Sequence, residues 1–340
     1  MTRSKRLITM VFSMAAMAIL IFDSRTALNG MAEGIDLCLK VVIPSLFPFL
    51  ILSVVLTASA LGMKLGFLVP LCRLCRIPSS AAPLLLVGFI GGYPVGAQSV
   101  TNAWQCGNLS DTDAKRMLGF CSNAGPAFIF GMTAGLFSSA AVPWALWLVQ
   151  MTAALLTGIL LPGEPSSDHK PNLSHSLSPA AVLHQSVGAM ASICGWVIIF
   201  RTLLCYGDRW ILPALPQYAR CMIAGVLELT NGCCRLVSIP SESLRFLFCS
   251  GFLAFGGIGV YMQTMSVTPG LGTGSYLQGK LMQTALAVIL SWSVCPVLFS
   301  TGITAVSLLG LGPLAVFLIF SRKILPIRKN NSRNLTVQRV

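Results

Sequence analysis

Long apolar segments without a charged residue alternate with short polar stretches along the chain. The charge-free runs cover residues 7–22, 41–63, 77–110, 117–163, 246–279 and 281–321. About 20 apolar residues suffice for one helical crossing of a bilayer, so several of these runs can hold two crossings. The pattern predicts an all-α fold, a polytopic transmembrane bundle of about ten helices (8–10). We expect them near residues 7–22, 41–62, 78–100, 121–137, 141–161, 187–206, 211–229, 246–266, 281–298 and 303–320.

One polar stretch divides this series in two. Residues 162–180 are rich in Pro, Ser and His and cannot contribute to an apolar core, so they indicate a flexible linker. We therefore expect a first membrane half over 1–161, a polar linker over 162–186, a second membrane half over 187–321 and a basic tail over 322–340. The helix over 121–137 either spans the membrane or is re-entrant, because only three residues separate it from the next.

A short pattern occurs once in each half. The sequence G-G-x-x-V-x-x-Q is formed by Gly91, Gly92, Val95 and Gln98, and again by Gly256, Gly257, Val260 and Gln263. Each copy falls on the third helix of a group of five. Because an odd repeat length reverses the second copy in the membrane, the pattern predicts a 5+5 inverted repeat. In transporters built this way, interrupted helices mark a binding site near the bilayer midplane.

The first copy carries the strongest break signal in the chain. Pro94 lacks a backbone donor, and Gly92 and Gly96 permit unusual dihedral angles, so we expect the helix to break around Tyr93. Broken helix at membrane depth is tolerated where it is buried in protein or lines a wet cavity. A new helix starting near Val95 would then direct N–H groups into that cavity. The alternative is that these glycines only permit close helix packing.

Two further stretches combine polar residues with helix-breaking ones. Ser122, Asn123 and Gly125 begin an apolar segment, where they either cap a helix or contact a ligand. Glu228 and Asn231 lie at the end of another. A carboxylate at membrane depth is costly and is a functional candidate, whereas at the interface Glu228 would be an ordinary solvated helix end.

Composition and charge support a membrane protein. Of the 340 residues, 55% are hydrophobic and 10% charged, against roughly 25% charged in soluble domains. Of the net charge of +13, +9 lies in two tails without acidic residues: three basic residues lie in positions 3–6 and six in positions 322–339. By the positive-inside rule we expect both termini in the cytoplasm. This placement does not fit nucleic-acid binding, which needs the cations on one folded face. Residues 7–22 lack a clear cleavage site, so we expect a retained helix rather than a signal peptide.

Metal, cofactor and enzyme chemistry find little support. The 12 cysteines lie mostly within apolar segments, and the three histidines are far from the two close cysteine pairs. We expect no metal site, no cofactor and no catalytic residue, because no zinc-ligand spacing, metalloprotease, nucleophile-elbow or P-loop motif occurs.

At these residues the chain resembles the sporulation integral membrane protein family, whose members carry the nucleoside-recognition (Gate) domain. The matching stretches are residues 92–97, 122–126 with Phe128 and Gly131, 228–232, and 255–263. Such domains are similar to parts of concentrative nucleoside transporters, ferrous-iron transporters and spore maturation proteins. Gly259 and Tyr261 stand where the family often has Ser and His, so a proton relay through that His does not carry over.

The resemblance implies a protein of the bacterial cell membrane, located around the forespore, that functions in endospore formation. The leading hypothesis is a permease or channel-like carrier for a small polar solute, nucleoside-like or other. The alternative is a membrane scaffold that assembles spore-envelope (cortex) machinery with other sporulation membrane proteins. Nucleic acid is not an expected partner.

Overall fold

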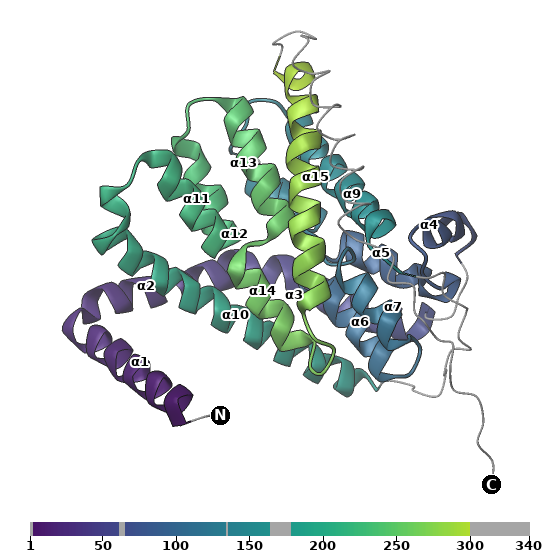
Figure 1. Cartoon of the computed structure of the whole chain (residues 1–340), viewed down its shortest axis with the longest axis horizontal. Helices are drawn as coiled ribbons and strands as arrows, with labels where there is room; N and C mark the ends of the chain where they lie inside the picture. The colour runs from purple at the N-terminus through teal and green to yellow at the C-terminus, as the bar shows by residue number, and fades with distance from the viewer. Residues whose placement is uncertain (1–2, 61–64, 134, 164–177, 300–340) are drawn as a thin grey trace.

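The computed structural model describes residues 3–60, 65–133, 135–163 and 178–299. In these ranges the chain is helical, with no strand (Figure 1). The expected helix over 303–320 and the basic tail lie outside them. A π-helical turn, η1 (Cys38–Val42), joins α2 to α3. The α-helices are α1 (Arg3–Phe22), α2 (Ser24–Leu37), α3 (Ile43–Ala60), α4 (Val69–Leu74), α5 (Ala82–Ile90), α6 (Val95–Gln105), α7 (Asp111–Leu118), α8 (Pro126–Thr133), α9 (Ala141–Leu160), α10 (Pro179–Trp210), α11 (Gln217–Leu227), α12 (Leu229–Arg235), α13 (Glu242–Phe255), α14 (Gly257–Val267) and α15 (Gly274–Leu298).

Five helical segments of the described chain are long and apolar enough to cross a membrane. A sixth is formed if the pair Gly66–Leu74 and Ser79–Ile90, bent by 116°, counts as one span. This confirms a helical membrane protein, whereas the ten helices and the inverted repeat stay predictions. The five segments are Ser24–Leu56, Ala141–Leu160, Pro179–Trp210, Glu242–Val267 and Gly274–Leu298.

Several expected boundaries are wrong. α8 has 8 residues where the sequence suggested residues 121–137, so it is too short to cross a bilayer by itself. α10 begins at Pro179, where Ser178 caps it, and residues 179–186 are therefore helical rather than linker. The helix expected over 78–100 is instead two helices, α5 and α6.

The helix α2 was not expected, because its residues lie outside the charge-free runs from which the helices were predicted. Charged residues in and next to α2 pair with α10. Arg201 on α10 forms an ion pair with Glu33 on α2, and Arg209 Nε lies 3.2 Å from Asp23 Oδ2. α10 itself continues to Trp210, beyond residue 206, where the expected helix ended.

Two helix pairs fold back on themselves as hairpins. In the first, α5 and α6 approach so closely that a Cβ on Gly96 would lie 2.9 Å from the Cα of Gly88. In the second, a Cβ on Gly232 of α12 would lie 2.2 Å from the Cα of Gly225 of α11. In a continuous helix the members of each pair would be about 10–12 Å apart. We call these pairs the first and second hairpins; their tips are residues 91–94 and Glu228.

Each hairpin packs against an interruption in the helices that follow it. A Cβ on Gly96 would lie 1.9 Å from the carbonyl oxygen of Cys121, in the non-helical stretch 119–125 between α7 and α8. A Cβ on Gly257, at the break between α13 and α14, would lie 3.1 Å from the carbonyl oxygen of Gly225. The long helices α9 and α15 follow, and Figure 1 shows them side by side with α13. The chain therefore contains the order hairpin, interrupted helix, long helix twice.

Candidate functional site

The first hairpin tip confirms the predicted break. α5 ends at Ile90 and α6 begins at Val95, and Gly92 between them has a φ of +84°, a left-handed conformation that favours glycine. The backbone of Gly92 also packs against that of Gly125, since a Cβ on Gly92 would lie 3.2 Å from the Gly125 nitrogen. The Tyr93–Pro94 peptide is cis. This tip therefore meets the interruption between α7 and α8.

The second hairpin tip consists of one extended residue, Glu228, whose side chain is 3% exposed. Its carboxylate caps α12 by accepting hydrogen bonds from Thr230 N at 3.0 Å, Asn231 N at 2.8 Å and Asn231 Nδ2 at 2.6 Å. The alternative that Glu228 is a solvated helix end is therefore wrong, because its carboxylate is buried and caps α12. The sequence placed Glu228 at the end of one helix, whereas it lies between two.

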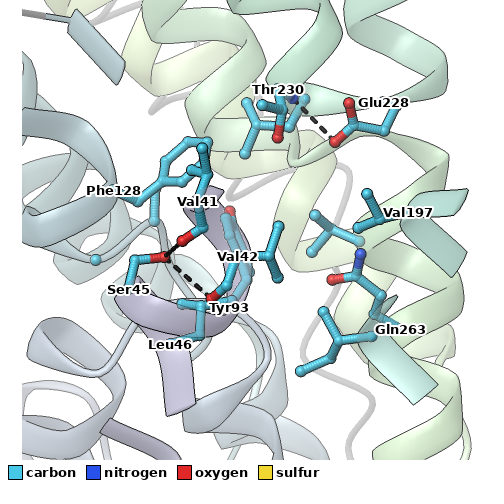
Figure 2. Close-up of a pocket in the computed structure, with 15 residues that line it drawn as sticks. Val41, Val42, Ser45, Leu46, Tyr93, Phe128, Val197, Glu228, Thr230 and Gln263 are labelled. Carbon is cyan, nitrogen blue, oxygen red and sulfur yellow. Dashed lines mark hydrogen bonds between the residues drawn. The ribbon is translucent and has the colours of Figure 1, made fainter. Parts of the chain in front are cut away.

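Both tips line one small, partly open cavity. Its volume is about 50 Å³, which is room for roughly three to five water molecules. Four residues predicted from sequence line it: Tyr93, Gly125, Glu228 and Gln263. Figure 2 shows Tyr93, Ser45 and Val42 on one wall and Glu228, Val197 and Gln263 on another. The cavity thus joins elements from both membrane halves.

The other predicted residues lie around this cavity without lining it. Asn123 and Asn231 take part in hydrogen-bond networks described below, and Gly92, Pro94, Gly96, Gly256 and Gly257 shape the tip and the breaks. Ser122 and Gln98 are buried, each with a side-chain oxygen that has no partner among the described residues. We expected Gln98 and Gln263 to face one cavity, but only Gln263 lines it.

The two copies of G-G-x-x-V-x-x-Q are placed differently. Gly91 and Gly92 form a hairpin tip, whereas Gly256, with a φ of +80°, and Gly257 lie between α13 and α14 within one candidate span. The tips nevertheless meet the breaks across the two halves. The single hydroxyl hydrogen of Tyr93 is shared between the carbonyl oxygens of Leu253, 3.0 Å from Oη, and Ala254, 3.2 Å from Oη, near the end of α13.

A fully buried lysine, Lys280 of α15, lies behind Tyr93 and was not predicted. Its Nζ donates to Tyr93 Oη at 3.1 Å, Asn123 Oδ1 at 3.4 Å and Gln283 Oε1 at 2.6 Å. Gln283 Nε2 also donates to Asn123 Oδ1 at 2.9 Å. These neutral oxygens occupy all three ammonium donors. In the described ranges no carboxylate pairs with Lys280. The signal was present in the sequence, because Lys280 is the one charge between two long apolar runs.

A second network supports Glu228 from outside the cavity. Asn231, which donates to Glu228, accepts a hydrogen bond from Arg201, and Arg201 pairs with Glu33. This chain of contacts connects α12, α10 and α2. Sequence reasoning missed Arg201 and Glu33, although a single arginine within the apolar segment 187–206 could have indicated them.

The fold and the site define a helical integral membrane protein in which two hairpin tips and an interrupted helix line one small cavity that contains a buried carboxylate. The chain is similar to the sporulation integral membrane protein YlbJ of Bacillus subtilis (strain 168), with 27% identity over 296 residues, covering 74% of this chain and 72% of that relative. No family model matches the chain, and no solved structure matches it. The similarity supports the resemblance to sporulation integral membrane proteins; the Gate domain stays a prediction.

Proposed function

We propose that the chain is a permease for a small polar solute in the membrane of an endospore-forming bacterium. The observation that carries this proposal is the cavity where the two hairpin tips meet, with Glu228, Gln263 and Tyr93 in its wall. Non-helical backbone and a buried carboxylate are both costly in hydrocarbon. A helix-packing role alone requires neither, whereas a binding site that opens to water in turn on each side uses both.

The paired order of hairpin, interrupted helix and long helix supports the same function. In secondary transporters, repeats of this sort place the site between them, and rocking of one repeat against the other exposes it alternately. We further propose that both termini are cytoplasmic and that the protein acts around the forespore. The support for a role in sporulation is the similarity to the Bacillus subtilis relative.

A binding screen of the purified full chain tests the permease. Thermal unfolding would be followed with panels of nucleosides, amino acids and small organic acids, in wild type and in Glu228→Gln. We expect at least one class to raise the midpoint in the wild type, because a ligand that binds only the folded state stabilises it. The Glu228→Gln variant should lose that shift, whereas Glu242→Gln, at a carboxylate outside the cavity, should keep it.

The scaffold alternative predicts that no solute raises the unfolding midpoint. If no solute class shifts the midpoint and Glu228→Gln supports normal sporulation, the cavity has no transport role and the scaffold is the better account. The enzyme hypothesis is not proposed, because the sequence contains none of the catalytic motifs considered above.

A further inference from the structure

The carboxylate of Glu228 lines the central cavity without a cation in contact. It accepts only N–H groups, from Thr230 and Asn231. The nearest linked cation, Arg201, donates to Asn231 and is already paired with Glu33. Lys280 lies behind Tyr93 with its three donors engaged, and no hydrogen bond joins it to Glu228. The carboxylate therefore faces a small cavity without a counter-charge in contact.

A second polar group faces the same space. The side chain of Gln263 is 5% exposed and lines the cavity, and no residue of the described ranges hydrogen-bonds its amide. Figure 2 shows this amide directed among the lining residues, between Val42 and Val197. A buried amide without a partner costs free energy unless something occupies the space beside it. This observation is independent of Glu228 and points to a bound species.

The lining indicates what that species is. Most of the lining is apolar, and its polar members besides Glu228 and Gln263 are Thr230, Ser45 and Tyr93, with neither histidine nor cysteine. The Tyr93 hydroxyl is already engaged with the end of α13 and with Lys280, so Thr230 and Ser45 are the remaining oxygen donors. Hard oxygen donors suit alkali and alkaline-earth cations rather than soft transition metals. The single carboxylate, Glu228, balances one positive charge, so a divalent ion would keep one uncompensated charge in the cavity. The volume, room for a few water molecules, suits a small ion with part of its hydration shell.

We propose that this cavity binds a partly dehydrated monovalent alkali cation between the Glu228 carboxylate and the Gln263 amide oxygen. The inference deepens the proposed function, because a cation bound where the two hairpin tips meet would be the coupling ion of the permease. Binding itself does not depend on transport. The site requires only that the cation enters from water and replaces the missing counter-charge.

Thermal unfolding of the purified full chain tests the proposal, with NaCl, KCl and LiCl compared against choline chloride at equal ionic strength. We expect at least one alkali salt to raise the midpoint saturably, by about 5 °C at a concentration roughly 100 times the dissociation constant. Glu228→Gln and Gln263→Met should lose the shift. Glu242→Gln and Gln98→Met, matched residues that do not line the cavity, should keep it. If Glu228→Gln does not fold, Gln263→Met carries the test.

Two results would overturn the cation site. Choline could raise the midpoint as much as the alkali salts, or both cavity variants could keep the alkali shift. The solute panel, repeated in choline buffer, separates this proposal from the permease. A solute that binds equally well with choline and with sodium refutes the cation while the permease stands. An alkali shift lost in the cavity variants supports the cation even if no solute binds.

Discussion

Tyr93 is the residue that connects most parts of the site. It lies at the tip of the first hairpin, lines the cavity and donates to the end of α13, while its hydroxyl accepts from Lys280. A single phenol thus fixes the tip relative to α13 and α15. Because the two carbonyl oxygens and the ammonium that it contacts are buried, removing the hydroxyl leaves them without compensation from water.

We predict that Tyr93→Phe destabilises the protein by about 1–3 kcal/mol, since buried partners lose their hydrogen bond while the ring is kept. Chemical unfolding in detergent micelles measures the change. Tyr218→Phe is the control, because Tyr218 is 47% exposed and should change stability by no more than about 0.5 kcal/mol. Equal effects of the two substitutions would contradict the role assigned to the Tyr93 hydroxyl.

At the scale of elements, the hairpins depend on glycines that let backbones meet. Gly96 on α6 packs against the carbonyl of Cys121, where a Cβ would lie 1.9 Å from the oxygen. No flexible side chain can move aside, because the neighbour is backbone. The first hairpin therefore needs glycine at this position, whatever the sequence around it.

Gly96→Ala should accordingly shift the hairpin and destabilise the fold by about 1–3 kcal/mol, as overpacking does in cores. Gly188→Ala on α10 is the matched control, because nothing lies within 4 Å of a Cβ there. Alanine favours helix over glycine, so that control should be neutral or stabilising by up to about 1 kcal/mol. Unfolding midpoints of the two variants provide the comparison. An unchanged Gly96→Ala protein would mean that the close packing does not exist.

The sequence predicted the position of the first break but not its shape. Pro94 and the neighbouring glycines interrupt helical hydrogen bonding wherever they occur, so the break could be predicted from the local sequence. Whether the chain then continues or folds back depends on Gly88 and Gly96 packing against Cys121, far along the chain. The two Gly-Gly pairs match in sequence because both contain a glycine in the left-handed conformation, Gly92 at a hairpin tip and Gly256 within a candidate span.

Part of the candidate site could be predicted, because single polar residues within apolar segments are visible in the sequence. Glu228 and Gln263 are conspicuous polar residues in apolar surroundings, and both line the cavity. Lys280 was equally conspicuous but was taken as the boundary of a helix that in fact begins at Gly274. Arg201 lies within an expected apolar helix and Glu33 outside every expected helix, and their pairing is a tertiary property that no local pattern contains.

For the whole molecule, the orientation in the membrane remains a prediction from charge. Basic tails flank the outermost apolar segments, so both ends should lie in the cytoplasm after an even number of crossings. Reporter fusions at each terminus, one active only in the cytoplasm and one only outside it, measure this. A signal from outside at either end would contradict the orientation and the inverted repeat that depends on it.

Accessibility of the central cavity from water tests the account most directly. In a background with the 12 native cysteines replaced, Gln263→Cys would be treated with a small, water-soluble, membrane-impermeant thiol reagent. The account predicts labelling of Cys at 263, because a permease site opens to water, and little labelling of Gln98→Cys, which is buried outside the cavity. If position 263 is as unreactive as position 98 from both sides of the membrane, the cavity is a dry packing contact and the permease is contradicted.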